Sequence, residues 1–271
     1  MSEWSNWVGS SETRRDVMTQ GLLDRFTATV GGRADPLAVQ PGLHWCLGLP
    51  DAPMAELGED GHPAKGGFLP PVPLPRRMWA SSSVEFLAPI GVGCEIERVS
   101  TVAEIKAKSG KSGELVFVEV DHVTSADGLE AVRERQSIVY RAPSDVKTPL
   151  PGTDGADLSG WTETRTLFPS ETMLFRFSAM TFNSHRIHYD LPYATAEEGY
   201  PALVVHGPLT ASLLLQLAAE QLESVRYFQF RGVSPAFCGQ PLHLTARFTE
   251  DGLEMAAIGG DGRQVMAASA R

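Results

Sequence analysis

Residues 209–222 read Leu-Thr-Ala-Ser-Leu-Leu-Leu-Gln-Leu-Ala-Ala-Glu-Gln-Leu, and this stretch decides the fold. Apolar side chains occupy most faces of the helix that it predicts, so the helix should be buried on nearly all sides. Pro208 comes directly before it and suits the first turn of a helix. A helix of this kind needs other elements packed around it, and the segments on either side of it read as strands.

Two runs of predicted strands flank this helix in the sequence. The first run covers 82–87, 95–107, 113–124 and 131–140, which are rich in Val, Ile, Phe and Tyr. The second run covers 225–231, 240–249, 252–258 and 264–270. Each run predicts an antiparallel meander, and each contains an Asp-Gly turn, at 127–128 and at 261–262. The similarity of the two runs indicates a duplicated unit.

A long buried helix wrapped by an antiparallel sheet is the hotdog arrangement, so two copies predict a double hotdog of the α+β class. We expect an N-terminal hotdog-like half at 1–145, a linker at 146–163 and a C-terminal half at 164–271 that carries the functional motif. The Pro- and Gly-rich stretch 50–75 lacks periodicity, and connections of that length are usually functional or disordered. The central helix of the first half is therefore expected to be degenerate.

Two shorter elements complete the prediction of secondary structure. Residues 13–30 place Val17, Leu22, Phe26 and Val30 near helical spacing, which predicts one amphipathic helix. Residues 172–178 predict a short strand at the start of the second half.

Composition narrows the class of protein. The chain has 271 residues with 42% apolar content, and no apolar run approaches the roughly 20 residues that span a membrane. Cys46, Cys94 and Cys238 are odd in number and widely spaced, which argues against a disulfide framework or zinc site and favours the cytoplasm. The net charge of −10 disfavours nucleic acid as a partner.

The functional motif is Asn-Ser-His-Arg-Ile-His-Tyr-Asp at 183–190, followed by Val-His-Gly-Pro at 205–208. Polar and titratable groups cost free energy to bury, so such a cluster beside a buried helix indicates a site. His188 suits proton transfer, because the ordinary pKa of a histidine lies near neutrality. The amide of Gly207, at the start of the helix, can donate to a developing oxyanion.

This motif resembles the hydratase motif Asp-x-Asn-Pro-aliphatic-His-x-Asp of the MaoC-like R-specific enoyl-CoA hydratases and dehydratases. By that resemblance Asn183 stands at the catalytic aspartate, His188 at the catalytic histidine and Asp190 at the trailing acid. The residues of the motif resemble those of one branch of the family, which includes mesaconyl-C4-CoA and itaconyl-CoA hydratases and mitochondrial 3-hydroxyacyl-thioester dehydratases. The resemblance implies an enzyme that hydrates or dehydrates acyl-CoA thioesters.

The departures from the motif leave two roles open. Asparagine cannot act as a base, so we expect Asn183 to position water while His188 moves protons. The second acid/base role is open between Asp190, His185 and His188 itself. Arg186 stands where the family has proline, and its guanidinium could bind a substrate carboxylate, Asp190 or the CoA pyrophosphate.

The remaining candidates are assigned by position and residue type. Predicted contacts to substrate are His206, Gly207, His185, Arg186 and Tyr189, and predicted contacts to CoA phosphates are Arg76 and Arg77, or Lys106, Lys108 and Lys111. His44 is expected in the core or lining a pocket, whereas His62, His122 and His243 are expected to be structural or exposed. No metal is expected, and no cofactor apart from the CoA of the substrate.

The leading hypothesis is reversible hydration of a short dicarboxylic enoyl-CoA, such as mesaconyl-C4-CoA or itaconyl-CoA, to citramalyl-CoA. One alternative is a 3-hydroxyacyl-thioester dehydratase of fatty-acid metabolism. Others are a hotdog thioesterase, which would carry a carboxylate near the helix start, and a non-catalytic acyl-CoA-binding protein. Because hotdog sheets have long edges to cover, a homodimer or larger homo-oligomer is expected, with neither nucleic acid nor membrane as partner.

Overall fold

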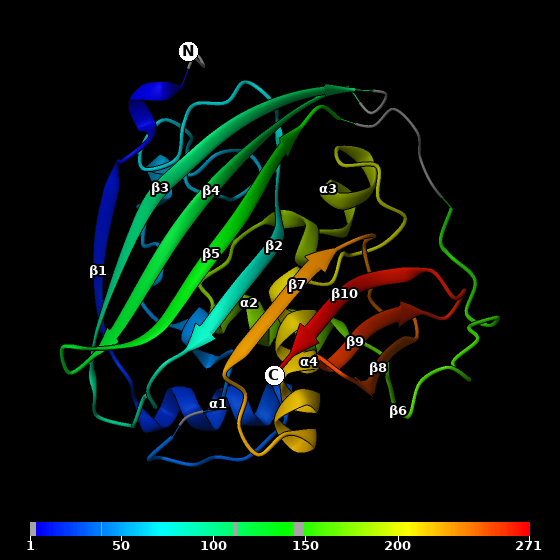
Figure 1. The fold of residues 1–271 in the computed structure, drawn as a ribbon. Coiled ribbons are helices and arrows are strands. Elements are labelled where there is room, and N and C mark those ends of the chain that lie inside the picture. The colour runs from blue at the N-terminus through cyan, green and yellow to red at the C-terminus, as the bar shows by residue number, and fades with distance from the viewer. Residues whose placement is uncertain (1–3, 39, 111–112, 144–148) are drawn as a thin grey trace.

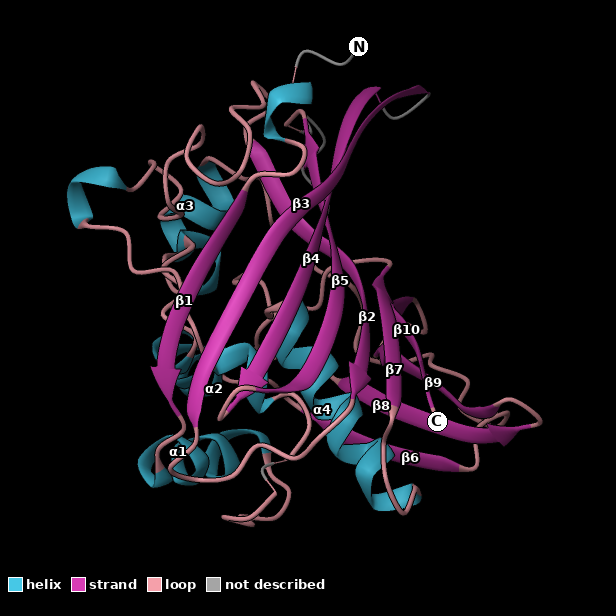
Figure 2. Cartoon of the chain, turned by 60° about the vertical axis from the view of Figure 1, so that its left-hand side comes forward, coloured by secondary structure: helices cyan, strands magenta, loops and turns pink. Residues whose placement is uncertain are grey.

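The computed structural model describes residues 4–38, 40–110, 113–143 and 149–271. Its ten strands form one antiparallel sheet in the order β1-β3-β4-β5-β2-β7-β10-β9-β8-β6 (Figure 1). The sheet curves around α2 and α4, and α1 lies near one end of the strands (Figure 2). The curvature creates the concave face on which the candidate site lies.

The strand order is the same in the two halves of the sheet. The N-terminal half contains β1 (Ser11–Val17), β2 (Arg76–Phe86), β3 (Glu95–Gly110), β4 (Gly113–Ala126) and β5 (Leu129–Arg141). The C-terminal half contains β6 (Glu163–Leu167), β7 (Tyr227–Gly232), β8 (Leu242–Thr249), β9 (Gly252–Gly259) and β10 (Gln264–Ala270). Each half places its second strand innermost, and β2 pairs with β7 to join the halves. The predicted double hotdog is confirmed, while the exact boundaries of the halves stay a prediction.

The long predicted helix is α4 (Gly207–Gln221), and it is the central helix of the C-terminal half. Every residue from Leu209 to Ala218 is buried, and the helix packs against β2 and β7 to β10. His206 is the N-cap residue and Pro208 lies in the first turn, as the sequence predicts. Burial on all faces explains why the apolar residues show little helical periodicity.

Two predicted elements are wrong. Residues 11–17 form an edge strand paired with β3, and a helix begins only after Thr19, whose hydroxyl accepts the Leu22 amide, to give α1 (Gln20–Val30). The predicted strand at 172–178 is instead part of the helix α2 (Glu171–Met180). Ser170 caps that helix, and the buried Leu174, Phe177 and Met180 follow helical spacing. The apolar composition of the segment had favoured a strand, but the cap and this spacing favour the helix.

Among its described residues, the N-terminal half has no helix like α4 along its concave face. Its helix α1 packs against α2 and α4, and the Pro- and Gly-rich loop supplies cover for the upper part of the sheet. In that smaller core Val72 of the loop packs with Val116, Val118 and Tyr140 of the strands. The remaining described helices are short, and they are α3 (Leu191–Ala196), η1 (Ser5–Trp7), η2 (Leu43–Cys46), η3 (Met54–Glu56) and η4 (Arg186–His188).

Within the described ranges, none of the helices has the length and apolarity that crossing a membrane requires.

Candidate active site

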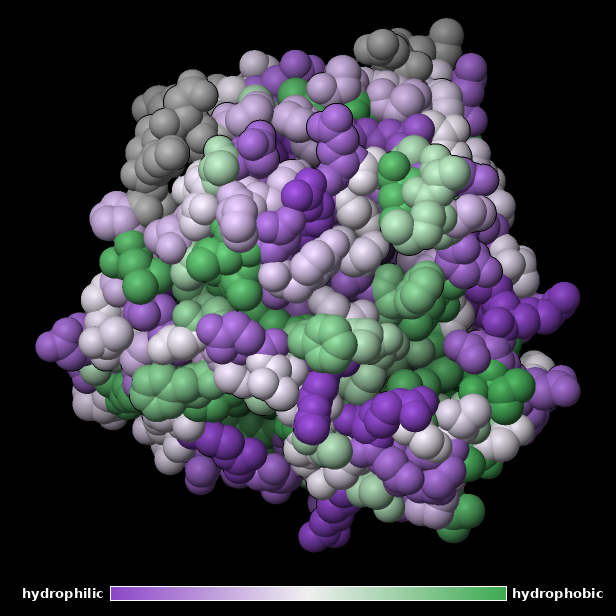
Figure 3. All heavy atoms as spheres, turned by 180° about the vertical axis from the view of Figure 1, so that it is seen from behind, coloured by the Kyte–Doolittle hydropathy of each residue, from purple (hydrophilic) through white to green (hydrophobic). Residues whose placement is uncertain are grey.

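A cavity of about 1930 Å³ lies between the sheet, the Pro- and Gly-rich loop and the motif segment of the C-terminal half. Its walls come from the loop 48–69, the concave face of β2 to β5, the segment 175–189 and the start of α4. Apolar patches interrupt the polar surface when the molecule is seen from behind the sheet (Figure 3). Phe175 and Phe182, which are 67% and 63% exposed, belong to the cavity wall. The volume exceeds the range typical of drug-sized pockets, so a long ligand can fit.

At this cavity, a hydrogen bond holds the neutral ring of His188 in one tautomer. Its Nδ1 donates a hydrogen bond to the carbonyl oxygen of Val204 over 2.7 Å. Because a carbonyl can only accept, Nδ1 carries the hydrogen and Nε2 keeps its lone pair in the neutral ring. Burial lowers the pKa of His188 to about 4, so the ring is an uncharged base at neutral pH.

His206 supports His188 from the side of the central helix. The two rings stack with centroids 3.6 Å apart, and His206 Nε2 lies 2.8 Å from the hydroxyl of Ser178. His206 is 1% exposed and does not line the cavity, so the predicted contact between His206 and substrate is not what the structure shows. The stack instead restricts the orientation of His188.

Gly207 and Asn183 both line the cavity near His188. Gly207 is the first residue of α4, so its amide has no acceptor within the helix and is available to an anionic ligand atom. The Oδ1 atom of Asn183 accepts the backbone amide of His185 over 3.0 Å. This bond leaves the Nδ2 group of Asn183, which can only donate, for water or ligand.

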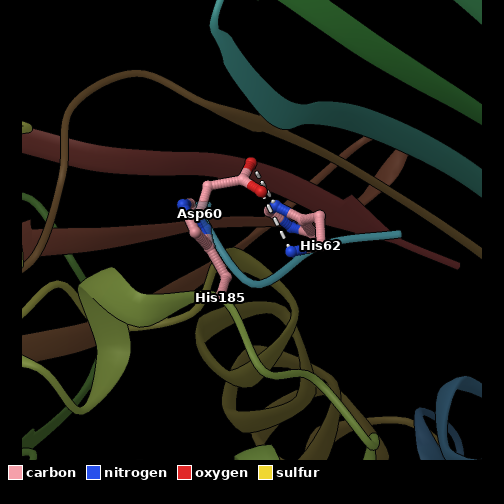
Figure 4. Close-up of side chains that lie close together, drawn as sticks. All are labelled: Asp60, His62 and His185. Carbon is pink, nitrogen blue, oxygen red and sulfur yellow. Dashed lines mark hydrogen bonds and ion pairs between the residues drawn. The ribbon is translucent and has the colours of Figure 1, made fainter. Parts of the chain in front are cut away.

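The structure adds a pair that sequence reasoning missed, Asp60 and His62 of the loop before β2 (Figure 4). His62 Nδ1 lies 3.0 Å from Asp60 Oδ2, and the His62 ring centroid lies 4.1 Å from that of His185. His62, expected to be structural or exposed, is instead in the cavity wall, in contact with Asp60 and His185. The one available signal was Asp-Gly-His within a long loop without periodicity, because nothing local indicates contact with a residue about 120 positions away.

Backbone contacts fasten this loop to the motif of the other half. The amide of Arg186 donates to Asp60 O over 2.9 Å, and the hydroxyl of Ser184 donates to Gly61 O over 2.5 Å. Gly61 has φ +87°, and a Cβ atom there would lie 2.0 Å from the carbonyl oxygen of Ser184. Only glycine fits this close approach, and it allows the N-terminal half to deliver His62 to the site.

Arg186 and Asp190 are engaged with each other outside the cavity. Arg186 donates through Nε and Nη2 to Asp190 Oδ2, over 3.0 and 2.7 Å, and its Nη1 donates to Glu59 O. Asp190 Oδ1 also caps α3 by accepting the amide of Tyr193. Neither residue lines the cavity, so this geometry gives no support to a catalytic role for Asp190 or a substrate contact for Arg186, and both stay predictions. Of the roles left open for Arg186, pairing with Asp190 is the one observed.

Of the two arginines predicted to contact CoA, Arg77 lines the cavity and Arg76 does not. Arg76 is 6% exposed, forms an ion pair with Glu198 over 3.0 Å and does not line the cavity, so its contact to CoA stays a prediction that this geometry does not support. Arg77 lines the cavity and donates to Pro63 O over 3.2 Å. Tyr189, which is 52% exposed, also lines it.

Lys106 and Lys108, two of the three lysines offered as an alternative for CoA, do not line the cavity. Lys106 pairs with Glu104 over 2.7 Å, and Lys108 lies over the ring of Phe117. Lys111 lies outside the described residues.

Asp60, His62 and His185 also form the one group of potential metal ligands found among the residues that the structure describes. Their donor atoms lie within 4.8 Å of one another. Asp60 already accepts the ring and backbone hydrogen bonds of His62, so the pair satisfies itself without an ion. The expectation of a metal-free site stays a prediction.

Comparison with known proteins gives the family. The profile described as hydroxyacyl-thioester dehydratase type 2 matches residues 42–238, and the chain belongs to this family. It is 40% identical over 275 residues to the mesaconyl-C(4)-CoA hydratase of Chloroflexus aurantiacus, covering 99% of this chain and 97% of that protein. It is 26% identical over 268 residues to the mitochondrial hydroxyacyl-thioester dehydratase type 2 of Schizosaccharomyces pombe, covering 85% and 88% respectively.

A solved structure shows the same fold. The crystal structure of HtdX from Mycobacterium tuberculosis matches with a TM-score of 0.71 at 17% identity, covering 96% of this chain and 99% of that chain. The family predicted from residues 183–190 is thus confirmed by the comparisons. The roles of individual site residues rest on the geometry alone.

Proposed function

We propose that this protein is a hydro-lyase that reversibly adds water to the double bond of an enoyl-CoA thioester. The observation that carries the proposal is His188, whose Nε2 is kept as a free base by the bond from Nδ1 to Val204. The free amide of Gly207 follows directly after His206, on which His188 stacks. A base and an oxyanion donor at one cavity wall are what hydration of a thioester requires.

The reaction balances with these groups alone. The oxygen of water bonds to the β-carbon while its proton passes to His188 Nε2, and the π electrons move toward the thioester oxygen. The amide of Gly207 donates to that oxygen in the enolate. The proton on Nε2 then passes to the α-carbon, the enolate collapses to the thioester, and His188 is neutral again. Asn183 donates from Nδ2 to orient the attacking water.

The substrate that we propose is a short dicarboxylic enoyl-CoA, mesaconyl-C4-CoA or itaconyl-CoA, which gives citramalyl-CoA. The enolate steps apply directly to mesaconyl-C4-CoA, whose double bond is conjugated with the thioester; itaconyl-CoA, whose double bond is β,γ to the thioester, must first become mesaconyl-C4-CoA by loss of an α-proton and protonation at the γ-carbon. The name of the Chloroflexus relative and its 40% identity over nearly the whole chain support this choice. The more distant yeast relative favours the alternative of a 3-hydroxyacyl-thioester dehydratase. A thioesterase is less favoured, because α4 has no acidic residue in its first turn.

We further propose that the enzyme works in the cytoplasm as a homodimer or larger homo-oligomer. The three free cysteines, of which Cys46 is buried, support a reducing compartment. Sheet edges at β1 and β6 support assembly, because an uncovered edge favours pairing with another chain.

The test follows the absorbance of the enoyl thioester with mesaconyl-C4-CoA, itaconyl-CoA, crotonyl-CoA and a medium-chain enoyl-CoA, for the wild type and His188→Ala. We expect the dicarboxylic thioesters to lose the enoyl band, and His188→Ala to abolish that loss. Activity confined to crotonyl or longer chains would favour the fatty-acyl dehydratase. Release of free thiol without hydration would identify a thioesterase, and an inert protein would be a binding module.

A further inference from the structure

We propose that His62, His185 and Arg77 form a subsite for the free carboxylate of a dicarboxylic thioester, and that this subsite selects the substrate. The proposal rests on the proposed function for the orientation of the ligand. It replaces Arg186, whose guanidinium is occupied by Asp190 and Glu59 outside the cavity. All three subsite residues line the cavity that His188 lines.

The positions of the rings place this subsite next to the reacting carbons. The His185 ring centroid lies 5.4 Å from that of His188, and the His62 centroid lies 4.1 Å from that of His185. A carboxylate carried by the β-carbon is one bond, about 1.5 Å, away from it. With the thioester oxygen at Gly207 and the β-carbon near His188, the carboxylate can extend along the cavity wall toward His185 and His62.

The hydrogen bonds of His62 leave one of its nitrogens for a ligand. Asp60 binds Nδ1, and the backbone bonds from Ser184 and Arg186 hold the loop in place. A protonated His62 can therefore donate from Nδ1 to Asp60 and from Nε2 to a substrate carboxylate. Asp60 is thus a positioning residue, and its negative charge stabilises the imidazolium instead of opposing the substrate.

The charges around His62 make binding of an anion and uptake of a proton mutually dependent. The groups that face it are Asp60, Arg77, His185 and His188. Burial, followed by repulsion from His62 and His188, lowers the pKa of His185 to about 2, and burial also lowers that of His62. Without a ligand the imidazoles are mostly uncharged. A bound carboxylate compensates for burial and favours the protonated ring.

The experiment compares succinyl-CoA with butyryl-CoA by titration calorimetry. These thioesters differ by a carboxylate in place of a methyl group, and neither has a double bond to hydrate. His62→Asn is the informative variant, because Asn keeps a donor for Asp60 and removes the second ring nitrogen. Arg77→Met removes the fixed charge, and His243→Asn, on β8 beside Thr166, is the matched control.

We expect the wild type and His243→Asn to bind succinyl-CoA about 10- to 100-fold more tightly than butyryl-CoA. His62→Asn should reduce that preference to within about threefold, chiefly by weakening the binding of succinyl-CoA. Arg77→Met should reduce it by about tenfold. Titrations in buffers of different ionisation enthalpy should show uptake of about one proton with succinyl-CoA in the wild type, and none in His62→Asn.

Equal affinities for the two thioesters in the wild type, or an undiminished preference in folded His62→Asn, would overturn the subsite. Loss of the preference on adding a chelator, with recovery on adding Zn²⁺, would also overturn it and make the trio a metal site. Because these thioesters cannot be hydrated, the outcome is independent of turnover. A preference for succinyl-CoA together with no hydratase activity would contradict only the proposed function.

Discussion

The two halves of the sheet have the same strand order, yet they bury different polar clusters. In the N-terminal half the Glu134 carboxylate accepts hydrogen bonds from Trp45 Nε1 over 3.1 Å and from Ser82 Oγ over 2.6 Å. His44 lies beside it, 3.8 Å away. In the C-terminal half His188 and His206 are stacked. Within the part of the chain that the structure describes, Nδ1 of His188 bonds to Val204 O and Nε2 has no hydrogen-bond partner.

This difference shows that burial of a titratable group does not by itself make a site. Burial lowers the pKa of His44 to about 3 and raises that of Glu134, but neither side chain lines the cavity. His188 is equally buried, yet it faces a space that a ligand can enter. The feature that distinguishes His188 from His44 and Glu134 is therefore its position in the cavity wall, where a ligand can reach its ring.

The comparison also shows that the halves depend on each other. The C-terminal half supplies the central helix, the amide of Gly207 and His188. The N-terminal half, whose concave face has no such helix, uses the freed loop to bring Asp60 and His62 to the motif. In place of such a helix, the N-terminal half has a loop, and this loop forms a second wall of the cavity.

The largest expected effect separates the two buried histidines. His188→Ala should lower kcat by about 10²- to 10⁴-fold, because it removes the proposed acid/base. His44→Asn should keep kcat within about threefold and lower the melting temperature instead, because His44 has no access to the cavity. Steady-state hydration assays with thermal unfolding of both variants make the measurement. Comparable losses of kcat would contradict the division between the halves.

The next effect concerns the helices of the two halves. Leu214 of α4 and Leu23 of α1 are both 0% exposed and belong to one hydrophobic core. Replacing either with Ala should lower the free energy of unfolding by about 2–5 kcal/mol. Leu129→Ala, at a position 71% exposed, should change it by less than about 0.5 kcal/mol.

Denaturant unfolding of these variants tests whether the halves share one core. A single transition that both buried substitutions shift is expected. Two separate transitions, each shifted by one variant, would show that the halves unfold independently.

A smaller effect appears as dependence of stability on pH. The folded-state pKa values of His44, about 3, and His188, about 4, lie below the ordinary 6.5. Between pH 6.5 and 4 the unfolded chain binds more protons at these sites, so the free energy of unfolding falls as pH falls. His44→Asn should flatten this slope, measured by urea unfolding at several pH values. An unchanged slope would mean that the pKa of His44 is the same in the folded and the unfolded chain.

The smallest expected effect tests the exposed ion pair of the motif. Arg186 and Asp190 have side chains 38% and 25% exposed, so Arg186→Gln should lower the free energy of unfolding by less than about 1 kcal/mol. Asp190→Asn should do the same, because asparagine can keep the cap of α3. Both variants should keep the preference for succinyl-CoA over butyryl-CoA, measured by calorimetry. Loss of that preference in Arg186→Gln alone would indicate that Arg186 binds the carboxylate of the substrate.

Much of the architecture could be predicted because its signals are local. The apolar run of α4, the alternation of β3 to β5 and the Asp-Gly turns each depend on neighbouring residues. The two wrong predictions concern segments whose secondary structure depends on contacts outside the local pattern. Residues 11–17 became an edge strand through pairing with β3, and 171–180 became a helix through the Ser170 cap and three buried side chains. Pairing with a distant strand leaves no mark in local periodicity.

The double hotdog and the family could be predicted from the amino-acid sequence alone, because they follow from a repeated pattern and a contiguous motif. The same motif predicts roles for His188, Gly207 and Asn183, and these roles stay predictions. Only the tertiary structure decided that Arg186 binds Asp190, that Arg76 binds Glu198, and that Asp60 and His62 join His185 at the cavity. Burial and charge pairing depend on the distance in space between groups. Folding brings Arg76 to Glu198 and Ser184 to Gly61 across more than 100 residues, whereas Arg186 and Asp190 are four residues apart and the structure shows which of several possible partners Arg186 takes.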